Sequence, residues 1–386
     1  MRQKIVHVTE ALGGGVLQYL LLLANSQARA GDDVVIIHSM RSDTPSSERL
    51  DRLFDPRVRR RVIDMKTAVG LHDLWTAPVL AMVLRSENAD IFHFHSSKAA
   101  AIGRISAKIL GIGDRVLYSP HGFSFLKKDI SPRKAKAYLF IERFLHALGG
   151  HIVTCSKSER LYASRLLGRS DRISVVENAV ELTDFSESDA TRGRRAVTVC
   201  TAGRVTYQKA PWRFSRIAKR AKRDAVDFVW FGDGESTAVS EWIDRDALEL
   251  TGWIESSRLR KQLAECDVFV LTSLWEGMPI ALIEAQAAGL PAVVSRIVGN
   301  RDVVIHGVTG FLANNDEELF LYTERLINDS ALRMRMGAAA REFAFRRFGG
   351  HKFFSSYVRL YRQLLNGPQG HHPVVVSDYW IEGAKK

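Results

Sequence analysis

The feature that most limits what this chain can fold into is an alternation of short apolar runs with helical patterns, which occurs twice along its 386 residues. In the first half, strands are predicted at Lys4 to Val8, Asp33 to His38, Arg61 to Asp64, Asp90 to Phe94, Val116 to Ser119, Ile152 to Cys155 and Ile173 to Val176. In the second half, they are predicted at Val197 to Thr201, Phe228 to Phe231, Glu249 to Thr251, Val268 to Leu271 and Ala292 to Ser295. Because strands and helices alternate, each half is expected to form a parallel, doubly wound α/β sheet.

Helical patterns lie between these strands and are clearest at Val16 to Arg29, Leu74 to Arg85, Lys98 to Leu110 and Arg133 to Leu148. A polar stretch, Asp184 to Gly193, separates the two halves. The length suits two domains better than one core. We therefore expect two Rossmann-like domains facing a cleft, over 1–185 and 194–350. A helix and tail over 351–386 could return to the first domain.

Composition narrows the class of protein. The chain has no run of about 18 apolar residues, so no transmembrane helix is predicted. The N-terminus, Met1 to Val8, reads as a first strand, and its apolar run is too short and too quickly interrupted for a signal peptide. Cys155, Cys200 and Cys266 are widely spaced, which argues against a disulfide framework or a zinc site and fits a reducing cytoplasm.

The formal net charge of +12 suggests an anionic partner, which could be nucleic acid, a membrane surface or an acidic substrate. No nucleic-acid-binding module accompanies the basic clusters, so no nucleic-acid partner is expected. In the segment Phe123 to Tyr138, aromatic residues interleave with Lys127, Lys128, Arg133, Lys134 and Lys136. Such a segment can lie on an anionic bilayer, where each cation contributes roughly 1 kcal/mol. Peripheral membrane binding is the favoured interpretation, and a solvated helix face is the alternative.

Two glutamates, Glu276 and Glu284, lie eight positions apart around a predicted strand–loop–helix junction. The loop follows the carboxyl end of a strand, which is where open α/β sheets bind ligands. Pro279 suits the first helical turn, and the amides of Gly277, Met278 and Ile280 would form a seat for phosphate. Carboxylates bind hydroxyls better than phosphate, so the ligand is expected to be part phosphate and part sugar. A capping glutamate plus a solvated helix glutamate is the alternative.

Each half also opens with a turn that suits phosphate. In the first half, Gly13, Gly14 and Gly15 follow the first strand, and a helix begins at once. Glycines allow close approach of the backbone to a ligand, although close packing of strand and helix explains many such turns. In the second half, Arg204 and Lys209 lie on one loop before a helix. Together they would neutralise a diphosphate, although cations on surface loops are common.

Three histidines are candidates for a site. His93 and His95 share one face of a strand, a spacing that metals can use, but no third ligand is evident near them. Hydrogen-bonded structural histidines are the favoured interpretation, and no metal site is predicted. His121 lies in a Pro-His-Gly turn after a strand, where a side chain can project into the cleft. A functional role is favoured for His121.

The segments Ser273 to Pro279 and Ala285 to Ser295, with the two glutamates, resemble the donor-site motif of the family 4 retaining glycosyltransferases. Those are nucleotide-sugar enzymes of the GT-B fold. Gly203-Arg204-x4-Lys209-x-Pro211 resembles the family's diphosphate clamp. Other matches, in the expected order, are Gly13 to Gly15, Phe92 to Ser96, Pro120 to Gly122, Phe231 to Glu235 and Thr251 to Trp253. The chain departs from the pattern at Gln286, where the family usually has Met, and at Gly299 to Asp302, where it more often has a Gly-rich turn followed by Glu.

The resemblance implies roles for individual residues. Its catalytic set is His121, Glu276, Arg204 and Lys209. Its donor-binding set is Gly14, Gly15, Gly203, Gly234, Gly277, Met278, Pro279, Ile280 and Glu284. Glu284 would hold the ribose and Glu276 the donor sugar, while Arg204 and Lys209 would stabilise the leaving diphosphate. No metal and no cofactor beyond the nucleotide sugar are expected.

The function implied is transfer of a sugar, with retention, from a nucleotide-diphosphate donor that is expected to be UDP-linked. The implied acceptor is a glycan or a polyprenyl-diphosphate oligosaccharide of a bacterial surface polysaccharide. We expect a cytoplasmic enzyme, peripheral on the inner face of the membrane. A nucleotide-sugar epimerase of GT-B fold is one alternative, although it would need a carboxylate set for proton abstraction. A non-catalytic nucleotide-sugar-binding protein is the other.

Overall fold

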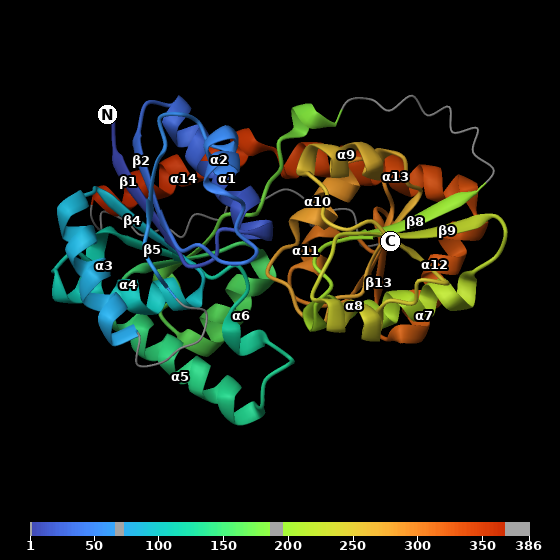
Figure 1. Cartoon of the computed structure of the whole chain (residues 1–386), viewed down its shortest axis with the longest axis horizontal. Coiled ribbons are helices and arrows are strands. Elements are labelled where there is room, and N and C mark those ends of the chain that lie inside the picture. Colours follow the sequence, from blue (N-terminus) through green and yellow to red (C-terminus); the bar gives the residue numbers. More distant parts are fainter. Residues whose placement is uncertain (1, 66–72, 186–195, 367–386) are drawn as a thin grey trace.

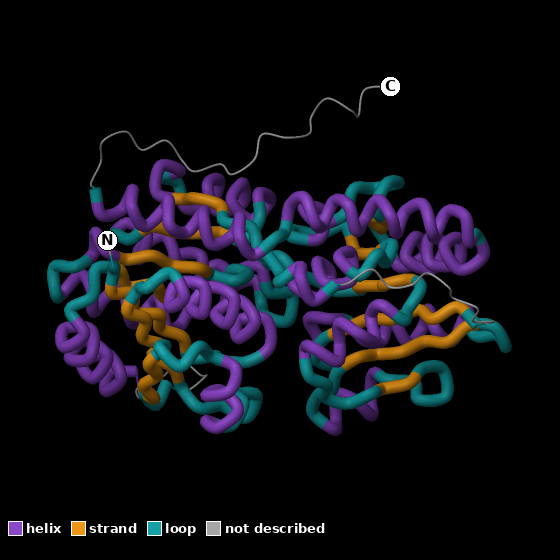
Figure 2. Tube along the Cα trace, turned by 90° about the horizontal axis from the view of Figure 1, so that it is seen from above, coloured by secondary structure: helices purple, strands orange, loops and turns teal. Residues whose placement is uncertain are grey.

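The computed structural model describes residues 2–65, 73–185 and 196–366, which form two α/β domains side by side (Figures 1 and 2). The first domain contains β1 (Lys4–Thr9), α1 (Gly14–Arg29), β2 (Asp33–His38), α2 (Ser47–Leu53), β3 (Arg59–Val62), α3 (Asp73–Glu87), β4 (Ile91–His95), α4 (Ser97–Ile109), β5 (Val116–Ser119), α5 (Pro132–Leu148), β6 (His151–Thr154), α6 (Lys157–Leu167) and β7 (Ile173–Val175). Parallel pairing joins its seven strands in the order β3-β2-β1-β4-β5-β6-β7.

The second domain contains β8 (Val197–Ala202), α7 (Pro211–Ala221), β9 (Val226–Phe231), α8 (Ser236–Trp242), β10 (Glu249–Leu250), α9 (Ser256–Ala264), β11 (Val268–Leu271), α10 (Ile280–Ala287), β12 (Ala292–Ser295), α11 (Asn300–Val303), β13 (Gly310–Ala313), α12 (Asp316–Asn328) and α13 (Ser330–Arg347). Its six strands pair in the order β10-β9-β8-β11-β12-β13. The prediction of two doubly wound, parallel α/β sheets is confirmed.

Strand order places the functional loops. In each sheet the winding reverses between two neighbouring strands, β1 and β4 in the first and β8 and β11 in the second. Ligands of open α/β sheets bind beyond the carboxyl ends of the strands at this reversal. The glycine turn after β1, the Arg204–Lys209 loop after β8 and the Glu276 loop after β11 therefore all start at such positions.

The last described helix, α14 (Gly350–Leu365), packs on α1 of the first domain, as Figure 1 shows. Its residues Phe353, Tyr357, Leu360 and Tyr361 are buried in the same core as the strand residue Ile5. The chain thus crosses between the domains twice. The two crossings lie together, because the Val180 amide donates to the Phe348 carbonyl at 3.0 Å. The part of the expected linker after residue 185 and the tail after residue 366 lie outside the described residues.

One strand was missed, and two local expectations were wrong. β13 was not predicted, because it is short and starts at Gly310, where the backbone runs close against Ala292 and a side chain would collide. β3 begins two residues before the predicted strand, since this edge strand of exposed and half-buried arginines takes its register from β2. Pro279 is the N-cap of α10, and the helix itself begins at Ile280.

None of the helices in the described ranges combines the length and the apolar character that crossing a bilayer requires.

Polar contacts between residues at the ends of the two sheets join the two domains. Asn178 donates its side-chain amide to the Met278 carbonyl at 2.7 Å, and the Ser158 amide donates to the Asp302 carboxylate at 3.1 Å. The functional loops of both domains therefore meet at one interface.

Candidate functional site

The centre of the site is an ion pair between the loops after β8 and β11. Lys209 Nζ lies 2.7 Å from Glu276 Oε1, and both side chains are largely buried. The Ser273 hydroxyl donates to the same Glu276 oxygen at 2.7 Å, and the Gln208 amide donates to the other oxygen at 3.3 Å. Charge-assisted bonds of this kind fix a carboxylate firmly. The sequence analysis named both charged residues as site residues but missed Ser273 and Gln208.

Backbone contacts explain why the Lys209 loop has its shape. Gly203 has φ +144°, a conformation that side chains disfavour, and its carbonyl accepts a bond of 2.8 Å from the Trp230 indole. The Lys209 carbonyl accepts the Thr272 hydroxyl at 2.8 Å, which joins this loop to the end of β11. A Cβ at Gly234 would lie 2.5 Å from the Val205 carbonyl. Gly234 therefore allows its own loop to pack closely against the loop that carries Arg204 and Lys209.

Arg204 crosses to the other domain. Its Nη1 lies 2.8 Å from the Asp43 carboxylate, in the segment between β2 and α2. Asp43 in turn lies against the glycine turn, because a Cβ at Gly13 would be 2.5 Å from the Asp43 carbonyl. Gly14 has φ +51° and starts α1, and Gly15 follows it in open space. The glycine turn and the clamp arginine are thus linked through an aspartate that sequence reasoning did not identify.

The Glu276 loop touches the Pro-His-Gly turn of the first domain. A Cβ at Gly277 would lie 2.8 Å from the Gly122 amide nitrogen and 3.0 Å from the His121 carbonyl carbon. His121 itself has φ +53°, in the left-handed region that few side chains adopt. The structure therefore brings His121, Gly277, Glu276 and Lys209 together, with no room for a larger residue at position 277.

Glu284 occupies the second turn of α10 and is 4% exposed. Its Oε1 lies 3.3 Å from Nη1 of Arg260 on α9, a partner that the sequence analysis missed. Met278 is buried before the helix, and its carbonyl is held by Asn178. The first amides of a helix have no partner within the helix, so the Ile280 amide at the start of α10 is free to bind an anion, and its role in binding phosphate stays a prediction.

The loop Gly299 to Asp302, which departs from the family pattern, has a contact across the interface. Asp302 accepts hydrogen bonds from both the amide and the hydroxyl of Ser158, at the start of α6. The same hydroxyl oxygen accepts the Gly299 amide at 3.0 Å. This loop therefore joins the two domains.

His121, which is half-buried, lies against a cluster of buried aromatic groups under the site. Its ring lies edge-on to Tyr19 of α1, with centroids 4.5 Å apart, and its Nε2 is 3.0 Å from His95 Nδ1. Burial lowers the pKa of His121 to about 4. The pKa of His95 is also lowered well below its usual value, first by burial and then by the neighbouring histidines. Both rings are therefore neutral near pH 7.

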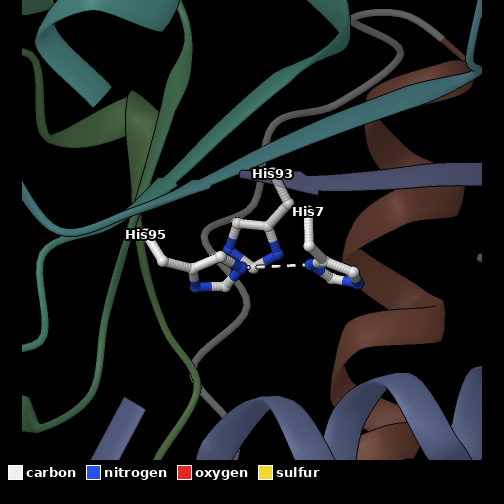
Figure 3. Close-up of side chains that lie close together, drawn as sticks. All are labelled: His7, His93 and His95. Atoms are coloured by element: carbon white, nitrogen blue, oxygen red, sulfur yellow. Dashed lines mark hydrogen bonds between the residues drawn. The ribbon is translucent and has the colours of Figure 1, made fainter. Parts of the chain in front are cut away.

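Among the described residues, His7, His93 and His95 form one group whose ligand atoms could share a metal ion, since these atoms lie within 4.8 Å of one another. Figure 3 shows the three rings side by side, with His7 and His95 joined by a hydrogen bond. His7 is the third histidine that the sequence analysis did not find. Every ring nitrogen of the three already has a protein partner at 2.8 to 3.0 Å. The donor set suits hydrogen bonding better than metal coordination.

Comparisons with known proteins agree on one family. Residues 13–184 match the family described as Glycosyltransferase Family 4, and residues 196–329 match the family described as Glycosyl transferases group 1. The Escherichia coli protein named UDP-Gal:alpha-D-GlcNAc-diphosphoundecaprenol alpha-1,3-galactosyltransferase is 32% identical over 282 residues, covering 67% of this chain and 69% of that protein. The Erwinia amylovora protein named amylovoran biosynthesis glycosyltransferase AmsK is 26% identical over 243 residues, 58% of each chain.

A solved structure shares the fold. The Anabaena protein HepE, in complex with UDP and glucose, aligns with a TM-score of 0.76 over 93% of this chain and 99% of that one, at 18% identity. Identity at that level shows a common architecture alone.

The buried histidines predict how stability depends on pH. Burial lowers the pKa of His7 and of His121 to about 4, whereas an unfolded histidine has a pKa of about 6.5. Between those pH values the unfolded chain binds more protons, so the free energy of unfolding should fall as pH decreases from 6.5 towards 4. Each such histidine contributes a slope of up to about 1.4 kcal/mol per pH unit. Urea unfolding at a series of pH values measures this slope.

Replacing His121 by Asn should make the slope shallower, because one imidazole with a lowered pKa is then absent from the folded protein. His351, which lies exposed on α14, provides the control, and His351→Asn should leave the slope unchanged. Equal slopes in all three proteins would contradict the prediction.

Proposed function

The chain belongs to the family 4 glycosyltransferases, has the GT-B fold and is of the type that builds bacterial surface polysaccharides, and we propose that it transfers a sugar from a nucleotide-diphosphate donor with retention of anomeric configuration. The acceptor proposed is a glycan or a polyprenyl-diphosphate-linked oligosaccharide. The donor proposed is UDP-linked. Neither a metal nor a cofactor takes part in the proposal.

The observation that carries this proposal is the Lys209–Glu276 ion pair against the His121 turn. A cation beside a carboxylate, at the reversal point of one sheet and in contact with the other domain, suits a ligand with both phosphate and hydroxyl groups. An ammonium group has three N–H donors, so Lys209 can bind a phosphate oxygen while it keeps Glu276 in place. Glu276 then presents its remaining acceptor sites to the hydroxyls of the donor sugar.

In the proposed reaction, the bond between the anomeric carbon and the diphosphate oxygen breaks. Arg204, Lys209 and the amides at the start of α10 stabilise the negative charge that develops on the diphosphate, which is electrostatic catalysis. The acceptor hydroxyl oxygen bonds to the anomeric carbon on the face that the diphosphate leaves. Its proton passes to an oxygen of the departing diphosphate. Glu284 holds the ribose, and His121 lies beside the transferred sugar.

The names of related proteins support the choice of substrates. The Escherichia coli relative is named for a UDP-galactose donor and a diphosphoundecaprenol-linked acceptor, and HepE was solved with UDP. A basic protein with a net charge of +12 also suits an acceptor that carries a diphosphate in an anionic membrane. These points support the proposed substrate class.

Incubation with a panel of nucleotide sugars and a soluble polyprenyl-diphosphate analogue tests the proposal. We expect release of the nucleoside diphosphate, in step with formation of a glycosylated acceptor that has the same anomeric configuration as the donor. An isomerised donor sugar would indicate an epimerase instead. Binding of a nucleotide sugar without turnover would indicate the binding-protein alternative.

A matched pair of variants tests the role of Arg204. Arg204→Ala removes both the cation and its ion pair with Asp43, whereas Asp43→Ala removes the same ion pair and keeps the cation. If Arg204 stabilises the leaving diphosphate, Arg204→Ala should lower kcat by about two orders of magnitude, comparable to the loss of an oxyanion-hole donor. Asp43→Ala should retain most of the activity. Equal losses in the two variants would assign Arg204 to holding the domains together.

Peripheral membrane binding is the second part of the proposal, and it rests on α5 and its neighbours. The five cations Lys127, Lys128, Arg133, Lys134 and Lys136 are all exposed. The aromatic residues expected to accompany them are not at the surface in the same way, since Phe123 is fully buried and Phe125 is half-buried. Further along α5, Phe140 is 71% exposed and Phe144 is 54% exposed.

Exposed apolar side chains continue onto the two helices next to α5 along the same domain. Figure 1 shows α3, α4 and α5 following one another there, and α4 packs against both of the others. Trp75 and Met82 on α3 are 78% and 65% exposed, and Ile109 at the end of α4 is 78% exposed. Large exposed apolar groups beside cations are typical of surfaces that bind a bilayer. We propose that these three helices dock on an anionic membrane.

Sedimentation with lipid vesicles tests the docking surface. The protein should sediment with phosphatidylglycerol vesicles but not with phosphatidylcholine vesicles, and high salt should release it, because exposed charges are screened within about 10 Å at 0.1 M. Replacement of the five exposed cations of residues 127–136 by Ser should weaken sedimentation and preserve transfer to a soluble acceptor.

The matched control replaces five exposed cations of the second domain by Ser, at Arg216, Lys219, Arg220, Lys222 and Arg223. The net charge changes by the same amount, but sedimentation should persist. Equal loss in both five-fold variants would reduce the effect to overall charge and remove the cations of residues 127–136 from the docking surface.

A further inference from the structure

The His121 ring is the first member of a continuous chain of hydrogen bonds that runs inward from the site. His121 Nε2 is 3.0 Å from His95 Nδ1, and His95 Nε2 is 3.0 Å from His7 Nδ1. His7 Nε2 is then 2.8 Å from the Gln27 side-chain oxygen. All four side chains come from the first domain, on β1, β4, α1 and the turn after β5. The proposed reaction assigns roles to none of them except His121.

The chain has a direction, because a neutral imidazole carries one N–H and one unprotonated nitrogen. The Gln27 oxygen can only accept, so the proton of His7 must be on Nε2 and its Nδ1 must accept. His95 then donates from Nε2 and accepts at Nδ1. His121 in turn donates from Nε2, which leaves its Nδ1 unprotonated. One glutamine oxygen thus decides the tautomers of three rings.

The far end of the chain is anchored by the helix that returns from the second domain. The Gln27 amide nitrogen donates to the Tyr361 hydroxyl of α14 at 3.3 Å, and this hydroxyl lies 3.0 Å from His93 Nδ1. His93 Nε2 lies 2.8 Å from the Ser119 hydroxyl. The Tyr361 hydroxyl can donate to His93 Nδ1, and His93 Nε2 can donate to the Ser119 hydroxyl. The orientation of the Gln27 amide is therefore compatible with all of these bonds. Turning the Gln27 amide over would reverse all the bonds from Gln27 to His121.

We propose that His95, His7 and Gln27 are positioning residues that hold His121 as the neutral tautomer with its proton on Nε2. The unprotonated Nδ1 of His121 is then a fixed acceptor for a hydroxyl of the bound sugar. This role in sugar binding rests on the proposed function. Among the hydrogen bonds of the described residues, none uses this nitrogen, so it keeps its acceptor capacity. Burial keeps all three rings neutral, because it lowers the pKa of each histidine.

A matched pair at position 7 tests the proposal, since Asn and Leu have the same branching. In His7→Asn, the side-chain oxygen replaces Nδ1 as the acceptor for His95. In His7→Leu, His95 loses its acceptor and is expected to move its proton to Nδ1, because a buried N–H without a partner is costly. His95 would then donate to His121 Nε2, and the proton of His121 would move to Nδ1.

Long-range nitrogen–proton NMR spectra of protein labelled with ¹⁵N-histidine report these tautomers without substrate. The His121 signals are identified by their loss in His121→Gln. The native protein and His7→Asn should show His121 protonated on Nε2, and His7→Leu should show it protonated on Nδ1. His93→Leu is the control. His93 is as buried as His7 and lies on the same strand as His95, but it is not part of the chain of hydrogen bonds between His121 and Gln27. That variant should leave the His121 tautomer unchanged.

Kinetics provide the second readout. Against His7→Asn, His7→Leu should lower kcat by about tenfold or more with little change in the KM for the donor, since a wrong tautomer can cost a catalytic imidazole up to about 10,000-fold. His121 protonated on Nδ1 in the native protein, an unchanged tautomer in His7→Leu, or stoichiometric metal bound to the native cluster would each overturn the proposal. If the spectra are as expected but the native protein transfers no sugar, the proposed function fails and the tautomer assignment stands.

Discussion

The contact between the backbones at Gly122 and Gly277 is the constraint on which the site depends. It places a turn of the first domain directly against the loop that carries Glu276, with no side chain between them. Because His121 precedes one glycine and Glu276 precedes the other, the histidine and the carboxylate come from different sheets but lie on loops that touch. Lys209 then completes the group from a third loop. A site assembled in this way exists only while the two domains are in contact.

Much of this architecture could be predicted because its signals are local. Buried parallel strands such as β4 and β11 are short apolar runs, and the loops at their carboxyl ends follow directly from the sequence. Lys209 and Glu276 could be named because each lies beside a strand end in a recognisable pattern. Their ion pair could not be derived, since it depends on how the β8 and β11 loops fold over one another.

The parts that were missed depend on contacts between distant segments. Asp43 has no local motif, and its role appears only when Arg204 reaches it from 161 positions away. His7 reads as an ordinary strand residue until β1 pairs with β4 and brings it beside His95. Both omissions reflect tertiary packing, which short patterns do not record. Pro279 differs from its expected place by one position only, because sequence patterns fix the end of a helix to within one or two residues.

The return of α14 to the first domain has a mechanical consequence. The chain passes between the domains once before β8 and once before α14, and one isolated parallel β-bridge, between Val180 and Gly349, joins these two passages. Glu177 and Arg347 add an ion pair across the same two passages. Two connected passages limit the relative motion of the domains more than one flexible linker, which permits twisting in any direction. Any opening of the interface would therefore be guided by these paired passages, and closure would bring Gly277 back against Gly122.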